Sequence, residues 1–442
     1  MNISIFFVSE RRTDRQTRRR RRRRRRRRSS SSSSSLSKLP STMSSAPLTA
    51  LAVLCLALPP GCRPAAGDDD DALRDPIRRN TDFSTRLYRA LASRTDDNVL
   101  LAAASVRRGL AALLAASGGT TREQLRLALG PAGPEPQDVP DPFSVTTSVP
   151  HGGAALNLKE GVAVFADAGA QPSASYADLV QSEFGGAVKS VSFAASQDAA
   201  DTVNAWVRRR TGDEVQDLVA ELEPDTRLLL ATAASYQGRF SQAFNASATQ
   251  DERFYVDKYH TVSVPMMFRA DKYFLAYDRS LKAGVLRLPM ADGAAMLVVL
   301  PDEDVDLGAV EDHVTSEKIR DWIGRLKKTK LEVQLPRFLL DRSYSLADVL
   351  RTLGVVRAFG EDADLSDAGV PPGVAVSQVL HKAVASMDES GGGDASGGGA
   401  AAAVFSDPPP RLTVNRPFLF VVYHRASGAL LLMGRLRDPT KK

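Results

Sequence analysis

The chain has 442 residues, of which 43% are hydrophobic and 25% are charged, the balance of an ordinary globular protein. Its formal net charge of +6 would point to a nucleic-acid or membrane partner, but residues 1–66 alone carry 16 basic and two acidic residues. Residues 67–442 carry 42 basic and 50 acidic residues. Because the body of the chain is acidic, its charge argues against a nucleic-acid partner.

The first 42 residues contain an arginine run, 18–28, followed by a serine run, 29–35. Such a segment buries no apolar surface and repels itself, so we predict that residues 1–42 are disordered or lie upstream of the translated start. A nuclear-localisation or RNA-binding arm is the alternative interpretation.

Met43 begins a different pattern, in which an apolar stretch over 48–58 is followed by small residues. This order is typical of a secretory signal peptide with its cleavage site, which we place at residues 43–66. The stretch is too short to span a bilayer, and no other apolar run reaches the required length of about 18 residues. The sequence therefore predicts a secreted, extracellular protein without a transmembrane segment, whose mature domain covers residues 67–442.

Both cysteines, Cys55 and Cys62, lie in the predicted signal peptide, so the mature domain has none. This excludes a disulfide framework, a cysteine-based metal site and a cysteine nucleophile. The five histidines lack metal-ligand spacing, and no G-x-S-x-G, phosphate-binding loop or dinucleotide fingerprint is present. We therefore expect no catalytic residue, metal or cofactor, and a protein that is not an enzyme. Asn245-Ala-Ser is an N-glycosylation acceptor that fits a secreted surface loop.

Apolar residues recur at helical spacing in several parts of the mature domain. The four aspartates at 68–71 are expected to form a solvated tail, and residues 130–155, rich in proline and glycine, are expected to form a loop. Helices are expected over residues 80–95, 106–116, 120–129, 201–219, 307–327 and 344–353. The third begins with threonines placed three residues before Glu123 and Gln124, the spacing of a capping box.

The second half of the domain is richer in strand signals. Short apolar or alternating runs predict strands over 227–234, 261–267, 295–300, 331–335 and 379–387, and a C-terminal hairpin over 418–423 and 429–435. No linker divides the chain, so a single α+β domain is expected. Residues 390–410, before the hairpin, are mostly small and have no apolar face. A loop of about 20 residues without secondary structure is usually functional or disordered.

Short motifs follow one another along the domain in a fixed order. They are Val203-Asn-Ala-Trp-Val207, Thr211-Gly-Asp-Glu-Val215, Val264-Pro-Met-Met267, Leu335-Pro-Arg-Phe338, Ala363-Asp-Leu-Ser366, Val379-Leu-His-Lys-Ala-Val384 and Asn415-Arg-Pro-Phe-Leu-Phe420. In order and separation they resemble the motifs of the serpin family over roughly residues 75–442. The resemblance implies a serpin fold with three β-sheets, about nine helices and an exposed reactive-centre loop over about residues 389–412.

Serpins are suicide inhibitors of serine proteases. Their loop is bait, and after cleavage it inserts as a strand into a β-sheet with the acylated protease still attached. A loop that is first exposed and then buried needs small residues, which residues 390–410 supply. The resemblance therefore implies a monomeric, secreted inhibitor with a serine protease as its target.

The reactive bond can be placed by counting along the loop. In inhibitory serpins it follows the residue 16 positions after the hinge glutamate, and taking Glu389 as that glutamate gives the bond Phe405-Ser406. Arg411-Leu412 would suit a trypsin-like protease, but it leaves too few residues for the connection to the next strand.

The predicted hinge departs from the family's usual Gly-Thr-Glu followed by alanines. Here Glu389 precedes Gly391, Gly392 and Asp394. Alternate residues of an inserted strand face inward, so the Asp394 carboxylate would be buried at a cost of several kcal/mol. Each glycine in the inserted strand would cost about 0.5–1 kcal/mol relative to alanine.

Three more departures fall where the family controls sheet opening. Ala102-Ala103 replaces Ser-Pro, Thr232 replaces asparagine and Phe240 replaces tryptophan. With the irregular hinge, they leave a non-inhibitory serpin, acting as a carrier or binding protein, as the alternative function.

Asp257, Lys258 and Tyr259 occupy a triplet with which some serpins bind the plasma cofactor protein Z. Asp96 and Asp312 fall where the same serpins have further acidic contacts. The resemblance therefore implies protein Z as a partner and a coagulation protease, such as factor Xa, as the target. An acidic solvated surface is the alternative interpretation of these residues.

Overall fold

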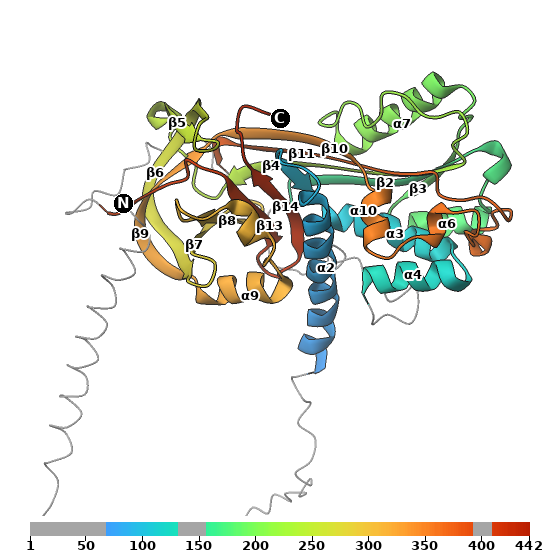
Figure 1. Ribbon diagram of the computed structural model, residues 1–442, viewed down its shortest axis with the longest axis horizontal. Helices are drawn as coiled ribbons and strands as arrows, with labels where there is room; N and C mark the ends of the chain where they lie inside the picture. Colours follow the sequence, from blue (N-terminus) through green and yellow to red (C-terminus); the bar gives the residue numbers. More distant parts are fainter. Residues whose placement is uncertain (1–67, 131–155, 392–408) are drawn as a thin grey trace, which may run out of the picture. The chain divides into compact units, whose positions relative to one another are not determined.

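The computed structural model describes residues 68–130, 156–391 and 409–442. The compact unit that contains every described strand spans Leu73–Lys442 (Figure 1). The predicted signal peptide, the segment before it and the loop at 131–155 lie outside the described residues. Predictions for those segments stay predictions.

Five strands form one sheet in the order β10-β11-β4-β2-β3. Their bounds are β2 (Leu158–Ala166), β3 (Ala187–Ser190), β4 (Leu228–Phe240), β10 (Phe338–Ser345) and β11 (Gln378–Gly391). Strand β11 is antiparallel to β10 but parallel to β4. The seam between β11 and β4 therefore joins two long strands that run in the same direction.

Nine strands form the other sheet, in the order β1-β14-β13-β8-β7-β6-β9-β12, with β5 paired to β6. Their bounds are β1 (Val99–Leu101), β5 (Gln250–Tyr255), β6 (Thr261–Asp278), β7 (Ala283–Pro289), β8 (Ala294–Pro301), β9 (Lys327–Pro336), β12 (Arg411–Thr413), β13 (Phe418–His424) and β14 (Leu430–Leu436). The first part of β6 pairs with β5 and its last part with β7. The described strands therefore form two hydrogen-bonded sheets where three were expected, because β6 pairs with strands on both sides of the larger sheet. Strand β6 curves strongly in Figure 1.

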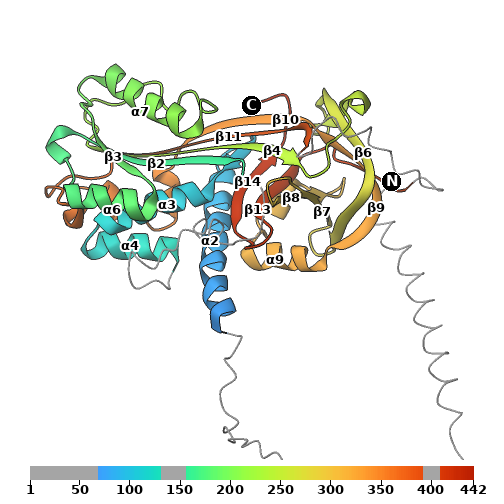
Figure 2. The same ribbon diagram turned by 180° about the vertical axis from the view of Figure 1, so that it is seen from behind.

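Eight α-helices lie in the described ranges, namely α2 (Asp68–Ala92), α3 (Ala103–Ala116), α4 (Gly119–Leu129), α6 (Ala174–Phe184), α7 (Ser196–Thr211), α8 (Leu307–Glu311), α9 (Ser316–Arg325) and α10 (Ala347–Thr352). Both views show α7 on one face of the five-stranded sheet and α3, α4 and α6 on the other (Figures 1 and 2). Because helices cover both faces, β4 reads as a nearly continuous apolar run, from Leu228 to Tyr236.

Alternate residues of the five-stranded sheet enter two separate cores. Leu230 packs in the same cluster as Val106 and Leu110 of α3. The preceding residue, Leu229, points to the other face and packs in the cluster that contains the buried residues of α7. In that cluster Trp206 of α7 lies edge-on to Phe165 of β2, with 5.8 Å between the ring centroids. The period-two alternation of the strands therefore holds the two helical layers on opposite faces of one sheet.

The predicted α+β fold is confirmed, but several local predictions were wrong. Residues 68–71 begin helix α2 rather than forming a tail. The capping box before α4 is absent, because α4 starts after Gly118 and Gln124 accepts hydrogen bonds from the backbone of residues 356 and 357 instead.

Two predicted helices also differ from the structure. The helix expected over 307–327 is divided into α8 and α9, because Thr315 caps the second helix by accepting a hydrogen bond from the backbone of Lys318 at 3.2 Å. The helix expected over 201–219 ends at Thr211, where Gly212 adopts a left-handed conformation with φ of 61°.

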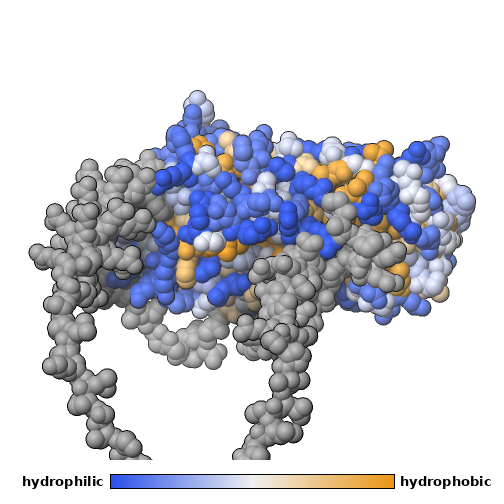
Figure 3. All heavy atoms as spheres, turned by 90° about the horizontal axis from the view of Figure 1, so that it is seen from below, coloured by the Kyte–Doolittle hydropathy of each residue, from blue (hydrophilic) through white to orange (hydrophobic). Residues whose placement is uncertain are grey.

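The surface in view in Figure 3 is mostly hydrophilic, with small hydrophobic patches. Large exposed apolar side chains are scattered over separate elements of the described chain: Leu127, Tyr255, Tyr259, Leu339 and Val356. Within the described ranges, no helix combines the length and the apolar character needed to cross a membrane.

Candidate functional site

The candidate site is the seam between β11 and β4 and the start of the loop that leaves β11. Ten consecutive residue pairs join the two strands, from Gln378 opposite Leu229 to Met387 opposite Gly238. Beyond a register irregularity, Gly391 pairs with Phe240. The seam is therefore closed from Gln378 to Met387 and is interrupted at residues 388–390.

His381 of β11 is fully buried and connects the seam to a third segment. Its Nδ1 lies 2.9 Å from the hydroxyl oxygen of Thr232 on β4, and its Nε2 accepts a hydrogen bond from the backbone N–H of Ala102 at 3.2 Å. Because a backbone N–H only donates, Nε2 carries no proton and Nδ1–H donates to Thr232. Thr232 in turn donates to the carbonyl of Leu380. One neutral imidazole thus ties β11 both to β4 and to the segment that precedes α3.

Burial lowers the pKa of His381 to about 3, so the ring stays neutral at physiological pH. Tyr344 of β10 stacks on this ring, with the two planes 13° apart. A second ring proton would place an Nε2–H against the N–H of Ala102, which is also a donor. Protonation of His381 therefore opposes the closed seam.

The structure accommodates the three departures from the family pattern near this seam. Thr232 supplies a hydroxyl to His381, and Ala102 uses its backbone rather than a side chain. Phe240 packs edge-on against Phe244 at 4.9 Å. The polar bridge across the seam is therefore present although the usual asparagine and serine are not.

The predicted hinge glutamate, Glu389, is held by three different segments and is 13% exposed. Its Oε1 accepts a hydrogen bond from the hydroxyl of Thr249 at 2.8 Å, and its Oε2 lies 3.5 Å from a guanidinium nitrogen of Arg337. Its backbone carbonyl accepts from the N–H of Phe244 at 3.1 Å. The start of the loop is thus fastened to the segment that follows β4.

Gly391 lies against the same segment. A Cβ atom at this position would be 2.6 Å from the Cβ of Ala243 and 2.8 Å from its backbone nitrogen, so only glycine fits without a shift of the backbone. The other predicted hinge residues, Gly392 and Asp394, and the predicted reactive bond Phe405-Ser406 lie outside the described residues.

The loop returns to the other sheet at β12, which pairs in parallel with β9. Arg411, the first residue of β12, makes an ion pair of 2.9 Å with Glu332 of β9. Arg411 is therefore already part of a hydrogen-bonded strand, and the reactive bond Phe405-Ser406 stays a prediction.

The predicted partner triplet forms the turn between β5 and β6. Oδ1 of Asp257 accepts hydrogen bonds from the backbone N–H groups of Tyr259 and His260, at 2.6 and 2.8 Å. These bonds and the His260 side chain lower the pKa of the Asp257 carboxyl. Asp257 therefore shapes the turn, whereas the side chain of Tyr259 is 90% exposed and faces solvent.

The two other predicted contacts, Asp96 and Asp312, both line one surface depression of about 450 Å³. The carboxylate of Asp96 is fully exposed and lies 3.8 Å from Arg437, while the carbonyl of Asp312 accepts from Arg89 at 3.1 Å. Beneath them, the buried ion pair of Arg435 and Glu311 spans 2.8 Å. The structure brings these two residues together, whereas the triplet lies on a separate hairpin.

Asn245 lies on the exposed segment that holds the hinge. Its Oδ1 accepts from the backbone N–H of Ser247, and its side chain is exposed, as a glycan acceptor requires. In the described ranges, no group of His, Cys, Asp and Glu side chains could hold a metal ion.

Two contacts that hold the site closed, those of His381 and Arg337, were not predicted from the sequence. A signal for His381 was present. Buried residues alternate along β11 as Val379, His381, Ala383 and Ala385, and a polar residue in that inward series needs buried partners. Arg337 carried no comparable signal, because its partner Glu389 is 52 residues away in sequence.

A family model described as "Serpin (serine protease inhibitor)" matches residues 78–439. The chain belongs to the serpin family. Serpins are not enzymes, and the inhibitory members of the family act on serine proteases.

Several characterised serpins resemble this one. The protein Z-dependent protease inhibitor of Mus musculus is 30% identical over 364 residues, which are 81% of each chain. The leukocyte elastase inhibitor of Bos taurus is 31% identical and is covered over 98% of its length by 81% of this chain. The crystal structure of the mouse protein Z-dependent protease inhibitor superimposes with a TM-score of 0.76 at 28% identity, covering 84% of this chain and all of that one. The structure of human thyroxine-binding globulin in complex with thyroxine also has a TM-score of 0.76, at 25% identity, with the same coverages.

The His381 bridge predicts how stability depends on pH. The unfolded chain takes up a proton near pH 6.5 that the folded protein excludes until about pH 3, so stability is lost as the pH falls through this window. We expect the free-energy advantage of the parent over His381→Gln, measured by urea unfolding, to shrink by roughly 2–3 kcal/mol between pH 7.5 and 4.5. His313→Gln, at an exposed histidine, should keep the pH dependence of the parent. An advantage that does not change with pH would show that His381 does not stay neutral in the fold.

Proposed function

We propose that this serpin is a secreted suicide inhibitor of a coagulation protease such as factor Xa, with protein Z as its cofactor. The observation that carries the inhibitory part is the seam between β11 and β4, which is parallel, closed and continuous with the reactive loop. The proposal on target and cofactor is supported by the protein Z-dependent relatives and by the exposed Tyr259.

The direction of the strands favours insertion of the cleaved loop. A segment that leaves β11 at Gly391 and folds back would be antiparallel to β11, and because β4 is parallel to β11, it would be antiparallel to β4 as well. Insertion would therefore replace one parallel seam with two antiparallel seams, which are more stable per residue. Several residues of the seam are small, among them Ala383, Ala385, Ala231 and Ala233.

Insertion competes with release of the protease. It must separate His381 from Thr232 and free Glu389 from Thr249 and Arg337. The predicted burial of Asp394 would slow it further. The two new seams must therefore stabilise the protein by more than these lost contacts did. Insertion must also be complete before the acyl bond to the protease is hydrolysed.

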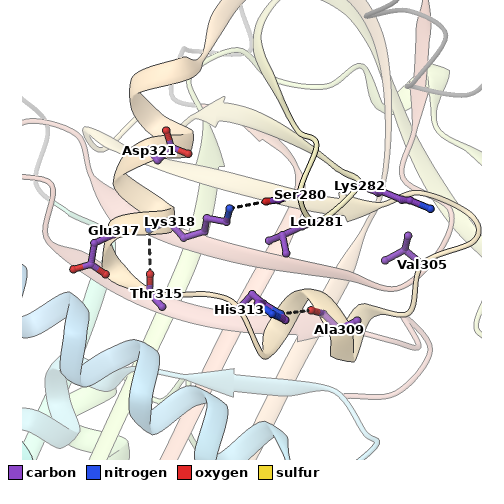
Figure 4. Close-up of a pocket in the computed structure, with 10 residues that line it drawn as sticks. All are labelled: Ser280, Leu281, Lys282, Val305, Ala309, His313, Thr315, Glu317, Lys318 and Asp321. Carbon is purple, nitrogen blue, oxygen red and sulfur yellow. Dashed lines mark hydrogen bonds between the residues drawn. The ribbon is translucent and has the colours of Figure 1, made fainter.

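A non-inhibitory binding protein is the second candidate, favoured by the irregular hinge and by the similarity to thyroxine-binding globulin. A depression of about 680 Å³ is lined by residues of α8, α9 and the turn from β6 to β7. Figure 4 shows these residues around it. Its charged groups are engaged within the protein: Lys318 donates to Ser280 and pairs with Asp278, and Lys282 pairs with Asp304. This pairing leaves few groups to orient a small ligand, so we favour the inhibitor.

The central test is a covalent complex with the protease. With factor Xa, protein Z, calcium and phospholipid, we expect an SDS-stable complex and a released peptide that begins at Ser406. Phe405→Ala should weaken complex formation, because it removes the side chain that enters the protease's specificity pocket. Arg411→Ala is the matched control and should have little effect. Cleavage without any complex, by factor Xa and by other chymotrypsin-like proteases, would favour the binding-protein candidate.

The exposed tyrosine of the partner triplet gives a second test. Removal of an exposed aromatic anchor commonly weakens an interface by more than about 1 kcal/mol, so Tyr259→Ala should weaken protein Z binding by at least about fivefold. Asp257→Ala is less informative, because Asp257 also shapes the turn. Leu127→Ala, at another exposed apolar side chain on α4, is the control. Equal affinities for parent and Tyr259→Ala in a binding titration would remove the triplet from the interface.

A further inference from the structure

The side chain of Met387 on β11 crosses the seam to the neighbouring strand. Met387 is opposite Gly238 of β4, and the regular pairing of the two strands ends at this position. A Cβ atom on Gly238 would clash with the sulfur of Met387 and would lie 2.9 Å from its methyl carbon. The thioether of Met387 therefore covers the α-carbon of Gly238.

Gly238 is needed for the space that it leaves and not for its backbone conformation. Its φ lies outside the left-handed region that favours glycine, so the backbone alone would accept alanine. The methyl carbon of Met290, which follows β7, is 3.1 Å from the same Cβ position. Met387 and Met290 are both buried. The thioether of Met387 thus fills a notch at Gly238 that is bounded by a residue of the other sheet.

Met387 lies between the two polar contacts that hold the seam. It is on the same buried face of β11 as His381, further toward the loop, and it comes shortly before Glu389. Glu389 is held by a hydroxyl and by a half-exposed arginine, whereas Met387 is held by close packing alone. Once Glu389 has been released, this packing is the next obstacle to the separation of β11 from β4.

We propose that Met387, seated in the notch at Gly238, is a plug that keeps the loop end of the seam shut and must leave the notch before the loop can insert. Strands in a sheet lie about 4.8 Å apart, so a strand inserted between β11 and β4 would take the space that the thioether crosses. The contact therefore exists only in the closed sheet. A contact that only one of two states makes shifts the equilibrium toward that state. Met387 is thus a positioning residue for loop insertion, an inference that rests on the proposed inhibitory function.

Amide hydrogen exchange of the full chain measures opening of the seam without any protease. Met387→Ala removes the plug, and Gly238→Ala displaces it by filling the notch. Each should therefore speed exchange of the amides at 236–238 and 385–387 by at least about tenfold. The double variant should exchange more slowly than Gly238→Ala alone, because the new Cβ enters the space that the thioether has vacated.

Leu125→Ala, at a fully buried leucine of α4, is the matched control. It should lower the unfolding temperature as Met387→Ala does, since both truncate a buried side chain, but should leave exchange at the end of the seam unchanged. Equal exchange there in the parent, Met387→Ala and Gly238→Ala would overturn the proposal. So would an equal increase in Leu125→Ala, because it would show that any loss of packing opens the seam.

A second readout connects the plug to insertion. Without it, insertion should be faster relative to hydrolysis of the acyl bond, so Met387→Ala should give a higher ratio of SDS-stable complex to cleaved product than the parent. Leu125→Ala should keep the ratio of the parent. Faster exchange in Met387→Ala with an unchanged ratio would contradict a role in insertion. If the parent forms no complex, the proposed function fails, whereas the exchange measurement still decides whether Met387 holds the seam shut.

Discussion

The parallel seam between β4 and β11 is the constraint on which the rest of the structure depends. It is the centre of the five-stranded sheet, it is covered by helices on both faces, and the reactive loop begins where it ends. A parallel pair is less stable per residue than an antiparallel pair, so the closed sheet is not the most stable arrangement that these strands could adopt. What keeps it closed is local: the His381 bridge in its middle and the contacts of Glu389 at its end.

These two contacts have different physical characters. His381 is neutral and wholly buried, so its hydrogen bonds act in a low dielectric and are insensitive to salt. Glu389 lies near the surface and is held partly by Arg337, which is half exposed, so this pair is weak and is screened by ions. The end of the seam where the loop begins is therefore the easier end to open, which is the order that insertion of a loop from that end requires.

Much of this was accessible from the sequence, and the failures are specific. Strand positions and the C-terminal hairpin followed from apolar alternation, because one face of each strand packs against a core. The capping box and the long helix at 307–327 failed, since Gln124 and Thr315 make contacts that no short-range pattern reveals. The bridge from Ala102 to His381 joins residues 279 positions apart, and the ion pair of Arg337 with Glu389 joins residues 52 positions apart. Contacts between residues so far apart in the sequence can be recognised only once the fold is known.

If the closed sheet is less stable than the sheet with the cleaved loop inserted, cleavage should make the fold more stable. Thermal unfolding before and after cleavage tests this most directly. The loop would be cut by a protease that is not inhibited, and the two fragments kept together. If the loop inserts between β11 and β4, the new antiparallel seams should raise the unfolding temperature by more than about 10 °C, a shift that corresponds to several kcal/mol in a domain of this size. An unfolding temperature that stays the same or falls after cleavage would contradict the account.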